Sequence, residues 1–253
     1  MDKTIIRAEN ACKSFAQNGA QNHVLDKVNV LIYEGDFTVI MGASGAGKST
    51  LLYVLSGMDA LTSGKVYYKD KEISSLSEKK MAPLRSEEFG FVFQQIHLVS
   101  NLTIFENVAV PGYLHHKKST MEVKKRADEL LTLMNVEKAK NRYPSQTSGG
   151  EGQRAAIARA MINNPGIIFA DEPTGALNKR NTIEVLNLLT KLNSDGQSIL
   201  MVTHDIRAAI RATRILYLED GNIIGEMKLS SYKEQEAKNR EAQVNEWLAS
   251  MEW

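Results

Sequence analysis

Apolar residues in the first third of the chain come in short runs that polar turns separate. The runs are rich in β-branched and aromatic side chains, with glycine or polar residues between them. Both features are typical of strands. The pattern predicts strands at TIIRAENACKSF (4–15), KVNVLIY (27–33), DFTVIMG (36–42), GKVYYKD (64–70) and FGFVFQQ (89–95), with helices at 47–57 and about 77–85.

The pattern becomes helical between about residues 102 and 143. The segments Thr103–Glu106 and Ser119–Glu122 both match the capping box, in which a hydroxyl and a glutamate three residues later close the first turn of a helix. We therefore expect a helical subdomain over about residues 95–165, inserted into the rest of the domain.

Strands return after residue 166. The run GIIFADE (166–172) is apolar without alternation, a helical segment follows at about 181–193, and QSILMVTHD (197–205) is a second apolar run. This part ends with another predicted helix, followed by the predicted strands RILYLED and NIIGEMK. Apolar strands separated by helices are typical of a parallel sheet covered on both faces. The predicted fold class is therefore α/β with a mixed, mostly parallel sheet.

The last residues form a charged segment with one apolar stripe. Val244, Trp247, Leu248 and Met251 follow the i, i+3, i+4, i+7 spacing of one helix face. Two interpretations stay open for this stripe. It packs on its own domain, or it binds a partner.

Composition and charge narrow the function classes. With 253 residues and 43% hydrophobic side chains, the chain can bury a full core. Its 31 basic and 30 acidic residues give no basis for a generic nucleic-acid surface. A single cysteine, Cys12, and the lack of a charged-then-apolar leader predict a reducing, cytosolic compartment. No run approaches the roughly 18 apolar residues of a membrane-spanning helix.

The stretch GASGAGKST (42–50) matches the phosphate-binding loop G-x-x-x-x-G-K-[ST], between a predicted strand and a predicted helix. Glycines let backbone N–H groups turn towards phosphate oxygens, Lys48 reaches the β- and γ-phosphates, and Ser49 ligates Mg²⁺. The residues predicted to bind nucleotide here are Gly42, Ser44, Gly45, Gly47, Lys48, Ser49 and Thr50.

A second chemical motif is the acidic pair at the end of GIIFADEP. Asp171 ends a buried strand, where a carboxylate can hold the hydration shell of Mg²⁺. Glu172, one residue further, would then polarise the attacking water. The alternative is a solvated acidic turn before Pro173.

A third motif is TSGGEGQRAAIARA (147–160), a polar, glycine-rich entry into a basic, alanine-rich helix. Ser148 and Glu151 form another predicted capping box, and the first N–H groups of such a helix attract phosphate. An ordinary capped helix explains these residues equally well when they are considered alone.

Together the three motifs resemble the nucleotide-binding domain of ATP-binding cassette (ABC) proteins, whose signature sequence is LSGGQ. The resemblance extends to about residue 228 and implies a P-loop NTPase core with an N-terminal antiparallel β subdomain and a helical subdomain. Residues 229–253 are then a C-terminal helical extension. Family cassettes pair head to tail, so the resemblance implies a homodimer in which Ser148, Gly150 and Glu151 contact the partner's ATP.

The resemblance also assigns roles to three further residues. Phe15 matches the aromatic that stacks on adenine, although its sequence context is more typical of a core residue. Gln94 matches the glutamine that senses Mg²⁺ and links to the membrane partner. His204 matches the switch histidine that contacts the γ-phosphate and the catalytic glutamate, and TGALN (174–178) matches the D-loop. The implied catalytic residues are Glu172, His204, Gln94 and Lys48, and the implied metal ligands are Ser49, Gln94 and Asp171.

Three positions depart from the family pattern. Thr147 replaces the signature leucine, and Gly152 replaces a common glutamine, at a cost of roughly 0.5–1 kcal/mol in helix propensity. Asn178 replaces the D-loop aspartate, which removes a charge that helps to couple the two ATP sites. Hydrolysis would be slower or less coupled, while nucleotide binding would be kept.

The resemblance implies an ATPase subunit of an ABC transport system, with ATP and Mg²⁺ as cofactors. Its partners would be a second copy of the chain and an integral membrane permease, which would hold it at the cytoplasmic face of the membrane; no nucleic acid is expected. The motifs look most like the macrolide-exporter and lipoprotein-release branch, and the ending leans towards bacitracin-resistance (Bce-type) modules. The alternatives are an ATPase for mechanotransmission or cell division, and a soluble ABC ATPase acting on DNA or ribosomes.

Overall fold

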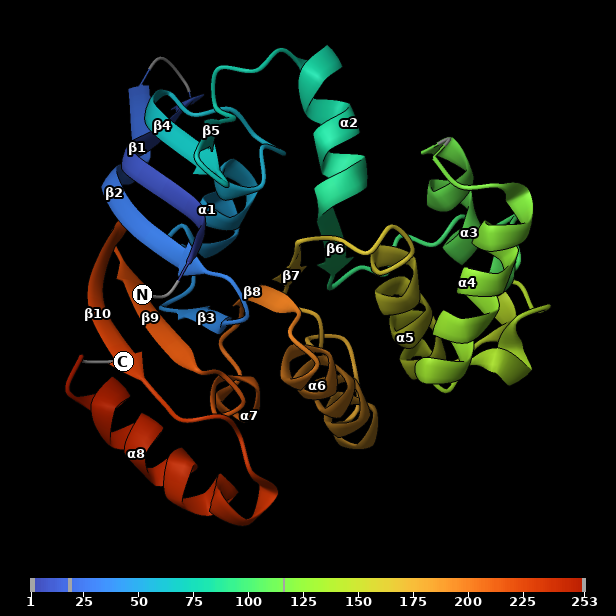
Figure 1. The fold of residues 1–253 in the computed structure, drawn as a ribbon. Helices are drawn as coiled ribbons and strands as arrows, with labels where there is room; N and C mark the ends of the chain where they lie inside the picture. Colours follow the sequence, from blue (N-terminus) through green and yellow to red (C-terminus); the bar gives the residue numbers. More distant parts are fainter. Residues whose placement is uncertain (1–2, 18–19, 116, 252–253) are drawn as a thin grey trace. The chain divides into compact units, whose positions relative to one another are not determined.

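The computed structural model describes residues 3–17, 20–115 and 117–251, and it divides into two compact units. The first unit combines residues 1–81 with 192–253, and the second contains residues 82–191. Each unit has its own set of strands and helices (Figure 1).

The N-terminal part of the first unit is a four-stranded antiparallel sheet in the order β2-β1-β4-β5. β2 starts seven residues before the predicted strand at 27–33, because polar residues there pair with the far end of β1, as in Phe15 opposite Asn22. The sequence pattern missed this part because its side chains are largely exposed. The strands are β1 (Thr4–Gln17), β2 (Ala20–Tyr33), β4 (Ser63–Tyr68) and β5 (Lys71–Glu72).

The remaining strands of the first unit have the order β10-β9-β3-β8. β3 pairs in parallel with both β8 and β9, and β10 runs antiparallel to β9. All residues of β3 and β8 are buried, which confirms the covered, mostly parallel sheet that their apolar runs predict. The elements are β3 (Phe37–Met41), β8 (Ser198–Val202), β9 (Arg214–Glu219), β10 (Asn222–Lys228), α1 (Lys48–Leu55) and α7 (Ile206–Ala209).

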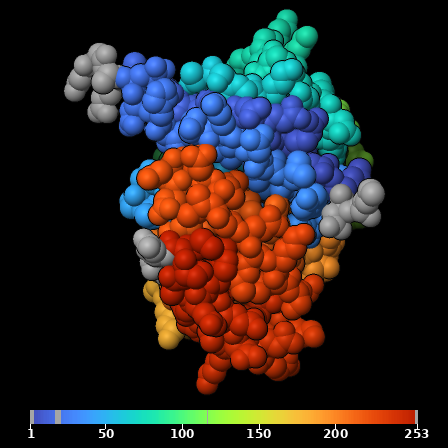
Figure 2. All heavy atoms as spheres, turned by 90° about the vertical axis from the view of Figure 1, so that its left-hand side faces the viewer, coloured from blue at the N-terminus to red at the C-terminus, as the bar shows by residue number. Residues whose placement is uncertain are grey.

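The C-terminal helix α8 (Ala237–Ala249) packs on this first unit, after a 3-10 turn at Glu234–Glu236. Val244 and Leu248 are fully buried, and Trp247 meets Tyr217 of β9 edge-on, with ring centroids 6.4 Å apart. Figure 2 shows the red C-terminal residues lying against the orange residues that precede them in the chain. The apolar stripe therefore packs on its own domain, the first of the two interpretations.

The second unit contains the two parallel strands β6 (Phe89–Phe93) and β7 (Ile167–Asp171) and a group of helices. The predicted capping boxes Thr103–Glu106 and Ser119–Glu122 are both formed, at the starts of α3 and α4. The helices are α3 (Ile104–Leu114), α4 (Thr120–Leu133), α5 (Gly149–Ala160), most of α6 (Lys179–Ser194), the end of α2 (Glu78–Glu88), and the 3-10 turns Glu137–Ala139 and Pro144–Gln146. Among the described residues, no helix is long and apolar enough to cross a membrane.

Candidate active site

The predicted phosphate loop lies between β3 and α1, as the sequence indicates. Gly42, Gly45 and Gly47 have φ values of 150°, 84° and 97°. At two of them the neighbouring backbone also excludes a side chain, because a Cβ atom would lie 2.0 Å from the Leu218 carbonyl oxygen at Gly42 and 2.8 Å from the Val24 carbonyl oxygen at Gly47. Glycine is therefore required here for both conformation and space.

The loop has the form of an anion cradle. The Nζ atom of Lys48 donates hydrogen bonds to the carbonyls of Gly42 and Ala43, both at 2.8 Å, so the ammonium group lies across its own loop. Ser44 and Gly45 are exposed at the turn of the loop, while Ser49 and Thr50 stand half-buried in the first turn of α1. N–H groups at the start of a helix and a nearby ammonium group fit a phosphate chain.

The register of the sheet brings His204 to the same edge as this loop. Ile40 of β3 is the parallel partner of Val202 of β8, and Gly42 and His204 each follow two residues later. His204 is exposed. The next residue, Asp205, caps α7 by accepting a hydrogen bond from the Arg207 N–H at 2.9 Å.

Phe15 also belongs to the first unit, near the end of β1. Its side chain is 43% exposed, which does not fit a core residue. The Nζ atom of Lys13 lies 4.8 Å from the centre of the ring. An exposed, cation-flanked aromatic ring fits the predicted stacking on a flat base.

In the second unit, strand register brings Gln94 beside the acidic pair. Phe93 of β6 is the parallel partner of Asp171 of β7, so Gln94 and Glu172 are the next residues on neighbouring strands. A Cβ atom on Gly175 would lie 2.9 Å from Nε2 of Gln94, so the glutamine side chain extends over the turn after Glu172. Three predicted groups, a carboxylate pair and an amide, therefore share one edge.

Glu172 has an unusual backbone conformation. Its φ of 45° lies in the left-handed region, which non-glycine residues rarely occupy. The turn is held by a hydrogen bond from the Gly175 N–H to the Glu172 carbonyl oxygen at 3.1 Å. Such conformations cluster at functional sites, where the surrounding structure enforces them.

The signature segment begins α5 with the predicted capping box. The hydroxyl of Ser148 accepts from the Glu151 N–H at 3.2 Å, and the Glu151 carboxylate accepts from the Ser148 N–H at 2.8 Å and from its hydroxyl at 2.9 Å. These bonds, led by the one from the Ser148 backbone, lower the pKa of Glu151. Ser148 and Gly149 are exposed, while Gly150 is buried against Asn181.

The three departures from the family pattern are accommodated locally. The Thr147 hydroxyl donates to the Pro144 carbonyl at 2.8 Å. A Cβ atom on Gly152 would lie 3.0 Å from Cδ1 of Ile96, so a larger residue would need that side chain to move. Asn178 accepts from the Asn181 N–H at 3.0 Å, an interaction that an aspartate would also make.

Two residues of α5 that no sequence motif singled out hold the segment on either side of Gln94. Gln153, 1% exposed, donates from Nε2 to the Phe93 carbonyl at 3.0 Å. Arg159 donates to the carbonyls of His97, at 2.6 Å, and Ile96, at 3.1 Å. No local pattern signals these bonds, because their acceptors lie about sixty residues away in the chain.

The predicted residues thus fall into two groups, one in each unit. The first unit holds the phosphate loop, Phe15 and His204, and the second holds Gln94, Asp171, Glu172 and the signature residues. Within the described ranges, no cluster of three or more His, Cys, Asp or Glu side chains could hold a metal by itself. That fits Mg²⁺ in nucleotide sites, which takes one or two protein ligands and phosphate oxygens.

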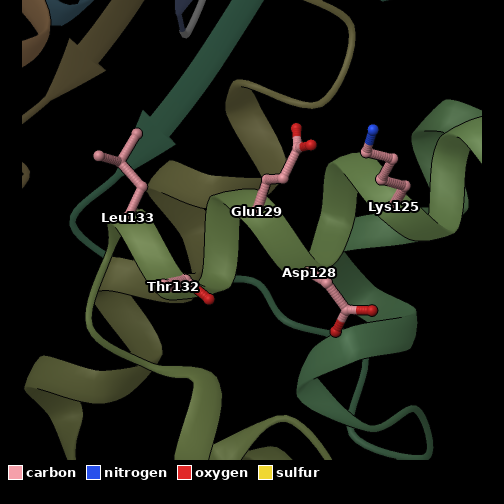
Figure 3. Close-up of a pocket in the computed structure, with 5 residues that line it drawn as sticks. All are labelled: Lys125, Asp128, Glu129, Thr132 and Leu133. Carbon is pink, nitrogen blue, oxygen red and sulfur yellow. The ribbon is translucent and has the colours of Figure 1, made fainter.

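A hollow of about 780 Å³ on α4 is not part of this set. It is lined by Lys125, Asp128, Glu129, Thr132 and Leu133, all exposed and all on one helix (Figure 3). Their polar groups point in different directions, and the Asp128 carboxylate is already paired with Lys140 at 2.9 Å. A small-molecule site needs convergent polar groups, so this hollow has the features of ordinary surface.

Comparison with known proteins now decides the family. The family model described as ABC transporter matches residues 25–175, more than half of the chain. This chain belongs to the ABC transporter family. A relative from Methanocaldococcus jannaschii, the uncharacterized ABC transporter ATP-binding protein MJ1508, is 44% identical over 220 residues, which cover 87% of this chain and 98% of the relative.

Solved structures of ABC proteins agree with this placement. The dimeric structure of MJ0796, described as a bacterial ABC transporter cassette, is 41% identical, with a TM-score of 0.84, over 90% of this chain and all of that one. The same cassette in a post-hydrolysis state with ADP and phosphate gives a TM-score of 0.83. CbiO1 of Clostridium perfringens, part of the complex cbiONQ, is 28% identical with a TM-score of 0.79, and the match covers 90% of this chain and 89% of CbiO1.

The chain is therefore an ABC-type ATPase subunit whose cofactors are ATP and Mg²⁺. The predicted α/β P-loop fold, with its antiparallel N-terminal sheet and mixed parallel sheet, is confirmed. The likeness to MJ1508 and MJ0796 supports the lipoprotein-release and macrolide-exporter branch within the ABC family.

Proposed function

We propose that this chain hydrolyses ATP as one half of a homodimer that drives a separate membrane permease. The observation that carries this proposal is the register of β6 and β7, which sets Gln94 beside Asp171 and Glu172 at one strand edge. A glutamate next to an amide and a second carboxylate suits the polarisation of a water molecule near a metal-bound phosphate.

Each predicted residue takes one role in this reaction. Lys48 and the N–H groups around Gly45 and Gly47 neutralise and orient the phosphates. Ser49, Gln94 and Asp171 supply oxygen ligands or hold the hydration shell of Mg²⁺, which reduces the negative charge of the phosphates. Glu172 accepts the proton of the attacking water, and His204 contacts the γ-phosphate. Phe15 stacks on the adenine ring.

The dimer supplies the remaining contacts. Ser148, Gly150 and Glu151 bind the γ-phosphate held by the other copy, because the exposed start of α5 presents N–H groups to an anion. The dimeric structures of the 40–41% identical cassette MJ0796 support this arrangement. In a two-fold dimer, each contact occurs twice, so two ATP molecules are enclosed.

Through its permease, this ATPase works at the cytoplasmic face of the membrane, in a complex and not as a free enzyme. The membership of CbiO1 in a larger transporter complex supports a membrane partner. The motif GFVFQQIHLVSNLTIFENV favours the macrolide-exporter and lipoprotein-release branch, and the ending ILYLEDGNIIGEM favours export of, or resistance to, antimicrobial peptides. We assign residues 1–228 to the ATPase domain and residues 229–253 to an extension.

Replacement of the proposed catalytic carboxylate tests the chemistry. Glu172→Gln keeps the size of the side chain and removes its basicity, so turnover falls by about 100-fold or more while ATP binding stays near wild type. The trapped ATP-bound dimer is measured by size-exclusion chromatography. The matched control is Glu184→Gln on α6, where the wild-type Glu184 pairs with Arg154 of α5. Unchanged steady-state hydrolysis in Glu172→Gln would remove Glu172 from its role.

Purification from native membranes tests the partner. The expected result is co-purification of a permease and a rise in ATPase activity in the complex. A permease with a bulky external domain supports the peptide-resistance role. Recovery free of membrane partners and bound to DNA or ribosomes would overturn the transport proposal and leave the ATP chemistry in place.

A further inference from the structure

The guanidinium group of Arg240 anchors α8 to the rest of the first unit. The residue is 3% exposed. Its Nε donates to the Ile210 carbonyl at 2.7 Å, its Nη2 to the Ala212 carbonyl at 2.6 Å, and its Nη1 to the Ser230 carbonyl at 2.8 Å. One side chain thus ties three backbone positions together.

Burial of the guanidinium group costs free energy of desolvation. An apolar side chain would dock the helix without this cost. Removal from water lowers the pKa of Arg240. A buried charge is tolerated when hydrogen bonds replace its hydration, and here backbone oxygens do so. The apolar stripe already docks the helix through Val244 and Leu248, both fully buried. Docking of α8 therefore does not by itself account for the position of the arginine.

The carbonyls that Arg240 holds belong to the end of the short segment that carries His204. β8 leads through Thr203 and His204 into α7, and Ile210 is the C-cap residue that directly follows α7. Carbonyls at the end of a helix have no partner within the helix, so they are free to accept from another element. Arg240 supplies those donors from α8.

Other hydrogen bonds fix the two ends of the same segment to β3. The Thr203 N–H donates to the Ile40 carbonyl at 3.2 Å, and the Thr213 N–H donates to the Phe37 carbonyl at 2.9 Å. Between these ends lie His204 and α7, whose far end Arg240 holds. Arg240 of the C-terminal helix thus adds a third attachment to this segment, beside the two that β3 provides.

An aromatic side chain reinforces the contact. The Tyr232 ring lies 4.2 Å from the guanidinium carbon of Arg211, just after α7, and 5.7 Å from that of Arg240. Its hydroxyl donates to the Glu234 carboxylate at 2.9 Å. The segment before α8 thus covers both arginines.

We propose that Arg240 is a positioning residue for ATP hydrolysis, which acts through the carbonyls at the end of α7 on the placement of His204. The inference rests on the proposed role of His204. It makes the C-terminal helix a part of the catalytic framework, because a shift of α8 would move the segment that contacts the γ-phosphate. Small misplacements of a positioned group have large effects on rate.

The test compares Arg240→Gln with Val244→Ala in the full-length chain. Both changes weaken the docking of α8, and only the first removes the bonds to Ile210 and Ala212. For Arg240→Gln we expect kcat to fall about tenfold, with the KM for ATP within about twofold of wild type. For Val244→Ala we expect kcat to stay within about twofold of wild type, even if its Tm falls as far as that of Arg240→Gln. Arg240→Lys keeps the positive charge but offers fewer N–H donors, so we expect an intermediate kcat.

A second background identifies the route of the effect. With His204→Ala, which itself slows turnover, a further Arg240→Gln change produces no additional loss of kcat. The inference is overturned by equal kcat losses in Arg240→Gln and Val244→Ala, or by a full tenfold loss in the His204→Ala background. If Arg240→Gln does not fold, the comparison of Arg240→Lys with Val244→Ala decides. Wild-type turnover of His204→Ala alone would instead refute the proposed role of His204.

Discussion

Replacement of Asn107 by alanine should release the loop between the Gln94 segment and α3. The Asn107 side chain is buried, with the residue 2% exposed. Its Oδ1 accepts from the Val99 N–H at 2.7 Å, and its Nδ2 lies 3.0–3.1 Å from the carbonyls of Val99, Leu102 and Thr103. One carboxamide thus organises the whole turn.

The magnitude follows from the count of donors and acceptors. The amide has two N–H groups for three carbonyls, so the arrangement amounts to about three full hydrogen bonds. At a net contribution of about 1 kcal/mol each, the loss is about 3 kcal/mol. Because Val99 is half exposed, water replaces part of the lost hydrogen bonding. We therefore expect a loss of about 2–3 kcal/mol in local stability.

Hydrogen exchange at the Val99 amide is the suitable assay, because a chain with two units need not unfold in one step. A loss of about 2–3 kcal/mol in local stability corresponds to a protection factor lower by roughly 30- to 150-fold. Asn101→Ala, an exposed change in the same loop, is the control and should stay within about 0.5 kcal/mol. A change below about 1 kcal/mol for Asn107→Ala, or an equal change in the control, would refute the reasoning.

Two further predictions concern the signature segment and the last strands. Ser148→Arg should keep ATP binding by the monomer and abolish the ATP-driven dimer. The control, Ser148→Ala, loses the helix cap, at a cost of about 1 kcal/mol, without adding bulk. A dimer of the Ser148→Arg variant in size-exclusion chromatography would contradict the contact with the partner's ATP. The hydrogen bond from Arg214 lowers the pKa of Glu226, so its stabilising effect is present above about pH 4.5 and is lost as the pH falls through the lowered value. Urea midpoints of wild type and Glu226→Gln should therefore differ at pH 7 and converge at low pH, and a constant difference would exclude this cause.

Features that depend on residues close together in the chain could be predicted from the sequence. The capping boxes at Thr103, Ser119 and Ser148 form as predicted, because both partners lie within one helical turn. The phosphate loop likewise has its positive φ angles at the predicted glycines. The family motifs are contiguous too, so the comparisons confirm the family and the fold that they indicated.

Contacts between residues that are distant in the chain could not be predicted in this way. Gln94 and Glu172 are neighbours because β6 and β7 pair in one register, which a local pattern does not specify. The same holds for Gly42, whose lack of a side chain is required by a carbonyl of β9, and for Arg240, whose partners Ile210 and Ala212 lie about thirty residues away. Such contacts depend on how whole elements pack. The residues next to a buried polar residue in the sequence therefore do not show whether it positions a site or only fills the core.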